Sequence, residues 1–90
     1  MNFGQAIEAL KTSLNDKTAP TVRVAREGWN GKGMWLSCVD PYNNKQFSLT
    51  EKEIEGTFAP YIGMKTADNK YVPWLASQTD MLAEDWQIVE

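Results

Sequence analysis

The first fifteen residues carry apolar side chains at the spacing of one helical face. Four positions follow that period: Phe3, Ile7, Leu10 and Leu14. Asn2, with Gln5 three residues later, forms a capping-box pattern that starts a helix at this point. Because an isolated helix of this length is unstable in water, its apolar stripe must cover another layer. The pattern therefore predicts an N-terminal helix packed on a sheet.

Beyond the loop at residues 15–20, the apolar period changes to two, which is the period of a strand. Val22 and Val24 share one face of a strand that begins near residue 21. Asn30 and Gly31 favour a two-residue hairpin turn, because both tolerate the positive φ that a type I′ turn requires. Gly33 adds a second permissive position, where a bulge can form.

The return strand, from Met34 to Val39, is apolar on both faces. Such a strand is central in its sheet, or one of its faces meets a partner. Alternating stretches predict further strands over residues 58–64, 71–74 and 86–89, and Pro60 belongs at an edge or at a strand's start. Between them, residues 40–57 predict a turn, a short strand around Phe47 and Leu49, and a helical turn or exposed loop.

Ser77 opens a second, shorter helical signal, because it can cap a helix with Asp80 at the third position. The fold class is therefore α+β. A single domain over residues 1–90 packs its N-terminal helix on a twisted antiparallel sheet of about five strands, with a short helical turn near the C-terminus. A chain of 90 residues buries only roughly 60% of its extended surface, so we expect an oligomer.

Composition and charge exclude several classes of function. The net charge of −3 argues against binding a nucleic acid polymer through its phosphates. With no histidine and one cysteine, Cys38, the chain cannot build the usual zinc site or a Ser-His-Asp or Cys-His mechanism by itself. No stretch reaches the roughly 20 apolar residues of a membrane helix, and no signal-peptide pattern is seen. We expect no metal, no cofactor and no membrane partner.

Four tryptophans are the most distinctive chemistry in the chain. Trp35 and Trp86 lie inside predicted strands, which favours the core. Trp29 lies at the mouth of the hairpin and Trp74 lies just before a helix start, where the pattern fits binding and core packing equally well. A purine can stack on aromatic rings at strand ends without hydrogen bonds that are specific to one base.

The segment from Trp74 to Trp86 holds the second candidate. The N–H groups that follow Ser77 could bind phosphate at the helix start, although the same residues cap the helix without any ligand. Asp80 and Asp85 could also serve a magnesium-dependent hydrolase, but acidic side chains are mostly surface charge. Three hypotheses stay open at this point: a nucleotide-binding protein, an interaction module and a metal-dependent hydrolase.

Three ordered stretches resemble a known family: MNFGQAIEALK, VAREGWNGKGM and YIGMKTADNKYVPWLASQTDMLAEDW. They are similar to the second type of phage Thoeris anti-defence protein. The resemblance covers roughly residues 1–14, 22–36 and 58–89, whereas residues 15–21 and 37–57 match nothing in it. The loop at 15–20 is longer than the family's usual helix-to-strand turn.

The resemblance implies a sponge rather than a catalyst. Members of the family bind the cyclic ADP-ribose-type signal of a bacterial immune TIR enzyme without cleaving it, so the Thoeris effector is not activated. Some members also bind cyclic dinucleotides at a separate site. They assemble as homotetramers with ligand pockets between protomers. The resemblance to such a phage protein also implies action in the cytoplasm of the infected bacterium. The alternative is a structural or interaction module of a phage or prophage.

The resemblance also implies a set of ligand-binding residues. Trp29 and Trp74 are expected to stack on or enclose the base. Asn30 and Gln78 are expected to bond its edge or a ribose, and Ser77 is expected to hold phosphate. The full set is Trp29, Asn30, Gly31 and Met34 from the hairpin, with Trp74, Ser77, Gln78 and Asp80 from the second motif.

Overall fold

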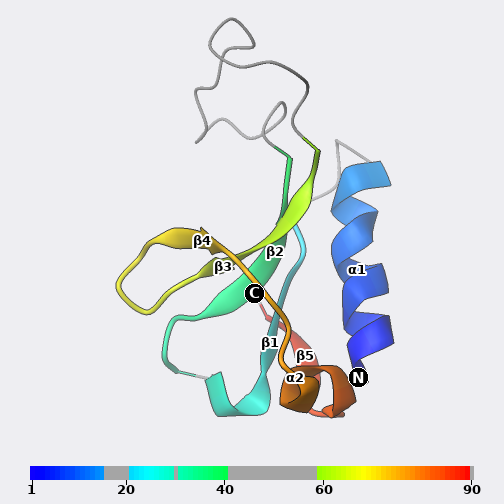
Figure 1. The fold of residues 1–90 in the computed structure, drawn as a ribbon, viewed down its shortest axis with the longest axis vertical. Coiled ribbons are helices and arrows are strands. Elements are labelled where there is room, and N and C mark those ends of the chain that lie inside the picture. The colour runs from blue at the N-terminus through cyan, green and yellow to red at the C-terminus, as the bar shows by residue number, and fades with distance from the viewer. Residues whose placement is uncertain (16–20, 30, 41–58, 90) are drawn as a thin grey trace, which may run out of the picture.

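The computed structural model describes residues 1–15, 21–29, 31–40 and 59–89 of the chain, and within them a helix and a sheet form two layers (Figure 1). The long helix α1 (Phe3–Asn15) lies along one face of a five-stranded sheet. The other elements are β1 (Arg23–Arg26), the short helix η1 (Glu27–Trp29), β2 (Trp35–Val39), β3 (Tyr61–Lys65), β4 (Tyr71–Pro73), α2 (Gln78–Leu82) and β5 (Trp86–Val89). This arrangement confirms the α+β prediction. The predicted strand at 47–49 lies outside the described residues.

The strands pair antiparallel throughout, in the order β4-β3-β2-β1-β5. Strands β1 to β4 neighbour one another in chain order, and the chain then passes through α2 to add β5 at the far edge, beside β1. Strand β2 is therefore central, as its two apolar faces predict. Pro60 directly precedes β3, which agrees with a proline at a strand's start.

The hydrophobic core lies between α1 and the sheet. Ala6 and Leu10 of α1 meet Val24, Leu36 and Trp86, and each of these side chains is at most 2% exposed. The register explains why these strand residues share a face: Val24 lies opposite Leu36, and directly paired residues point to the same side of a sheet. Burial of this apolar stripe is what stabilises α1.

Capping residues begin both helices as the sequence predicts. Gln5 N–H donates to Asn2 Oδ1 at 2.8 Å, and Asn2 N–H donates to Gln5 Oε1 at 2.9 Å. Ser77 and Asp80 form the second capping box, at the start of α2. None of the described helices is long and apolar enough to cross a membrane.

The connection between β1 and β2 corrects the predicted two-residue hairpin. The two strands do pair, but after β1 the chain enters η1, and it does not return to the sheet until Trp35. The ring of Trp29 packs against buried Trp86 at 5.5 Å between centroids, which takes the chain out of the strand at this point. A turn follows, in which Lys32 N–H donates to the Trp29 carbonyl oxygen at 3.0 Å.

Two glycines of this connection behave as the sequence predicts. Gly31 and Gly33 have φ values of 79° and 69°, a region that disfavours side chains. Asn30 lies outside the described residues.

Part of the sheet face that points away from α1 is packed with small side chains. Ser37 and Gly63 lie opposite each other on β2 and β3, and both are buried together with Ala25 and Val39. A Cβ atom at Gly63 would lie 2.9 Å from a methyl carbon of Val39, so this position accepts only glycine without a shift of its neighbours.

We predict that Leu10→Ala lowers the free energy of unfolding by about 2–5 kcal/mol, because it leaves a cavity beneath α1. Urea denaturation of the two proteins measures this difference. Glu8→Ala, on the exposed side of the same helix, is the matched control and should stay within about 0.5 kcal/mol of the parent. Equal effects of the two substitutions would contradict the proposed core.

Candidate ligand-binding site

A cluster of aromatic rings gathers around buried Trp86. Trp29 and Trp74 both meet it edge-on, with ring centroids 5.5 and 5.9 Å away and interplanar angles of 83° and 84°. Phe3 contacts the same ring at 5.8 Å. Edge-to-face packing of this kind is favourable for aromatic pairs. Trp29 and Trp74 are only half-buried, so the structure brings both predicted aromatic residues to one buried ring without enclosing them.

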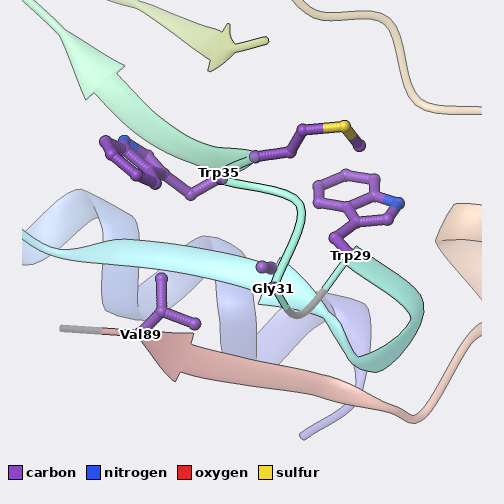
Figure 2. Close-up of a pocket in the computed structure, with 7 residues that line it drawn as sticks. Trp29, Gly31, Trp35 and Val89 are labelled. Atoms are coloured by element: carbon purple, nitrogen blue, oxygen red, sulfur yellow. The ribbon is translucent and has the colours of Figure 1, made fainter. Parts of the chain in front are cut away.

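A pocket of about 260 Å³ opens on one side of Trp29. In Figure 2, the indoles of Trp29 and Trp35 stand on opposite sides of it, with Gly31 between them and Val89 of β5 on the far side of β1. The lining residues are Ala25, Trp29, Gly31, Gly33, Met34, Trp35 and Val89. Three of the predicted site residues therefore share one pocket: Trp29, Gly31 and Met34. An aromatic and apolar lining is typical of small-molecule sites.

Trp35 is the pocket residue that the sequence assigned to the core instead. Leu36 faces α1, so its neighbour Trp35 points to the opposite side of the sheet, where it is half-buried. The guanidinium carbon of Arg23 lies 4.6 Å from the centroid of its ring, and Lys65 Nζ lies 4.4 Å from it. Strand alternation separates Trp35 from Leu36, but it does not reveal that α1 covers only one face.

The second predicted motif forms a closed cap at the start of α2. Ser77 Oγ accepts from the Asp80 N–H at 3.1 Å and donates to Asp80 Oδ2 at 2.8 Å, and Ser77 N–H donates to the same carboxylate oxygen at 3.1 Å. Gln78 is exposed beside them. The donors of Ser77 that were expected to hold phosphate are thus engaged by Asp80, and a phosphate there would have to compete with that carboxylate.

Arg26, at the end of β1, connects this cap to the strand that leads to Trp29. Its Nη1 lies 3.1 Å from Asp80 Oδ1, and its Nε lies 2.8 Å from Asp85 Oδ1. Glu27 N–H also donates to the Asp85 carbonyl oxygen at 3.2 Å. The two carboxylates considered for a hydrolase therefore face a guanidinium. Among the described residues, no group of three or more acidic, histidine or cysteine side chains could hold a metal ion.

These contacts shift the ionisation of both carboxylates. The hydrogen bond from Arg26 is the main cause of a lowered pKa at Asp85. Burial raises the pKa of Asp80, but the hydrogen bonds from Ser77 and the Arg26 guanidinium outweigh burial, so the pKa of this carboxyl is also below its ordinary value. Both groups are therefore charged at neutral pH and held by the same arginine.

We predict that Arg26→Met lowers the thermal midpoint at neutral pH, because it leaves two carboxylates without their cation. The pKa values of Asp80 and Asp85 are lower in the folded protein than the unfolded value of about 3.9, so their pairing with Arg26 stabilises the fold above about pH 4. This stabilisation is lost as pH falls through the folded pKa values. The difference between Arg26→Met and the parent should therefore shrink in acid, as thermal melts from pH 3 to pH 7 would measure.

Lys70→Met is the matched control for this experiment. It removes only the ion pair between Lys70 and Asp68, two well-exposed side chains. Such surface ion pairs contribute little to stability. A midpoint difference for Arg26→Met that stays constant over the whole pH range would contradict the assigned role of Asp80 and Asp85.

Comparisons with known proteins identify the family to which the chain belongs. The family model described as the Thoeris anti-defense 2-like domain matches residues 1–89, so residues 15–21 and 37–57, which the resemblance left unmatched, also lie within the matched range. A curated relative, Thoeris anti-defense 2 of Bacillus phage SP01, is 44% identical over 92 residues, which cover 99% of this chain and 94% of the relative. This chain therefore belongs to the Thoeris anti-defence 2 family, which places it among phage proteins that act against the Thoeris defence.

Proposed function

We propose that this protein binds a cyclic ADP-ribose-type immune signal and sequesters it without cleavage, so that the Thoeris effector is not activated. The observation that carries the proposal is the pocket between Trp29 and Trp35. A purine can stack on an exposed indole face, whichever base it carries. Membership of the anti-defence family supports the biological setting, and the cytoplasm of the infected bacterium is where such a signal would be intercepted.

The side-chain chemistry of the chain suits retention of a ligand better than its turnover. The chain has no histidine, and Arg26 pairs with both Asp80 and Asp85. Burial raises the pKa of the Cys38 thiol, which keeps it protonated and a poor nucleophile near neutral pH. We therefore propose no catalytic residue and no cofactor.

Assembly of several copies is part of the proposal, because one chain offers an incomplete site. The pocket of about 260 Å³ lies below the range of about 300–1,000 Å³ that is usual for ligand sites. One base–aromatic stack contributes about 1–3 kcal/mol, whereas nanomolar binding needs about −12 kcal/mol. Further contacts from a second protomer would enlarge the site, and the family resemblance favours a homotetramer.

Exposed leucines at α2 offer a surface for that assembly. Leu75 is 91% exposed and Leu82 is 79% exposed, and Met81 lies between them in the chain with partial exposure. Large apolar side chains that stay exposed in one short segment are candidates for a protein contact. The same surface favours the second candidate function, an interaction module that binds another phage or host protein, and the following experiments separate the two.

We predict that the protein depletes cyclic ADP-ribose-type signal from solution and that heat denaturation returns the ligand intact. Mass spectrometry of the supernatant before and after heating measures both steps, with cyclic dinucleotides in the same panel. Cleaved products would indicate an enzyme. If no nucleotide in the panel is retained and a partner protein co-purifies, the interaction module is the correct assignment.

Trp29→Ala is the variant that tests the pocket within this same assay. Its affinity for the retained nucleotide should fall at least tenfold, about 1.4 kcal/mol, because the stacking face is lost. Tyr61→Ala, which removes an exposed ring at the start of β3 and outside the pocket lining, should bind as the parent does. Thermal melts establish that both variants are folded, and undiminished binding by folded Trp29→Ala would remove this residue from the site.

We predict that Leu82→Asp lowers the mass of the assembly in native mass spectrometry, because it places a charge on the apolar surface around α2. Ile88→Asp introduces the same charge at a position on β5 that is 57% exposed, and it should leave the mass unchanged. An unaltered assembly of Leu82→Asp would place the contact between copies elsewhere.

A further inference from the structure

Arg23, Trp35 and Lys65 form a stack on the sheet face that points away from α1. They come from β1, β2 and β3, and β2 lies between the other two strands. Lys65 is directly opposite Trp35 in the register, with Nζ 4.4 Å from the indole centroid, and the Arg23 guanidinium lies 4.6 Å from it. The two cations therefore approach the indole of Trp35 from the strands on either side of β2, as cation–π contacts.

The two cations adjoin the pocket, and neither has an acidic partner among the described residues. The salt bridges within the described part of the chain involve neither Arg23 nor Lys65. Lys65 Nζ donates to the carbonyl oxygen of Gly33, a pocket residue, at 2.7 Å. Arg23 of β1 lies directly opposite Val89 of β5, which also lines the pocket. An acidic protein of net charge −3 therefore places two cations beside its aromatic pocket that form no ion pair with a described carboxylate.

Trp35 also carries a polar group without a partner. Its Nε1 atom is buried, and no described residue accepts a hydrogen bond from it. A buried N–H without an acceptor is unfavourable and rare in folded proteins. The indole N–H of Trp86, in contrast, has an acceptor: it donates to the Asp80 carbonyl oxygen at 3.0 Å.

We propose that Arg23, Trp35 and Lys65 form the anion-binding part of the pocket and hold the phosphate oxygens of the bound nucleotide. A guanidinium stacked on an indole keeps its in-plane donors available for phosphate, and a lysine ammonium acts as a point charge. Cations lie over the Trp35 ring, so the base stacks on Trp29 instead. This inference rests on the proposed function and deepens it by dividing the site into a base-stacking indole and a phosphate-binding stack.

The first experiment tests the anion site without any nucleotide. The indole N–H resonances of the ¹⁵N-labelled protein are followed during titration with inorganic pyrophosphate, and Trp35→Phe identifies the Trp35 signal. We expect that signal to shift saturably in the parent and to stay unchanged in the Arg23→Gln/Lys65→Gln variant. Lys11→Gln/Lys70→Gln changes the net charge equally at exposed positions, and it should respond as the parent does.

The second experiment measures the affinity of the same three proteins for cyclic ADP-ribose at several salt concentrations. The Arg23→Gln/Lys65→Gln variant should bind at least tenfold more weakly and with a flatter salt dependence, because fewer charges are screened. The conservative Arg23→Lys/Lys65→Arg variant keeps both charges and should recover most of the affinity. Thermal melts of each variant confirm that it is folded.

The two experiments separate failure of this inference from failure of the proposed function. Parent-like binding by the folded glutamine variant, with a Trp35 signal that ignores pyrophosphate, overturns the phosphate-binding stack while the sponge function stands. A saturable pyrophosphate response in a protein that retains no nucleotide of the panel supports the anion site and refutes the sponge.

Discussion

The burial of one indole, that of Trp86, is the interaction on which the functional end of this protein depends. Its ring is 2% exposed and is contacted by Phe3 of α1, by Trp29 of η1 and by Trp74 before α2. Its N–H is satisfied by the carbonyl oxygen of Asp80. A tryptophan buries a large apolar area and also needs an acceptor. The acceptor lies only six residues earlier in the chain, but the apolar contacts come from Phe3 and Trp29, which are distant in sequence. Burial of this one ring therefore fixes the position of these segments relative to one another.

Arg26 adds an electrostatic connection to this packing. It leaves the end of β1 and pairs with Asp80 and Asp85, while Asp80 also closes the cap with Ser77. The carboxylates that could suggest metal chemistry in the sequence therefore hold α2 and the start of β5 against β1. Rigid support of this kind is what a binding site needs if its indoles are to meet a ligand without further ordering.

The two faces of the sheet carry different kinds of side chain. The face under α1 holds the apolar core around Leu10 and Leu36. The opposite face carries Trp35 with its flanking cations and leads into the pocket beside Trp29. Strand alternation places the two sets of side chains on opposite sides, and α1 covers only one of them.

The sequence by itself determined the features that depend on near neighbours. The helical stripe, both capping boxes, the alternation of β2 and the positive φ at Gly31 and Gly33 are local, because each depends on residues a few positions apart. The family resemblance directed attention to Trp29, Gly31 and Met34, which do line one pocket.

Only the tertiary structure decided the features that depend on distant residues. It replaced the expected tight hairpin with η1, because Trp29 finds its partner in Trp86 near the other end of the chain. It also paired Asp80 and Asp85 with Arg26 of β1, and it placed Trp35 at the pocket beside Arg23 and Lys65 instead of in the expected core. Strand order and the face that a helix covers are set by long-range packing, and spacing along the chain does not encode which strands become neighbours.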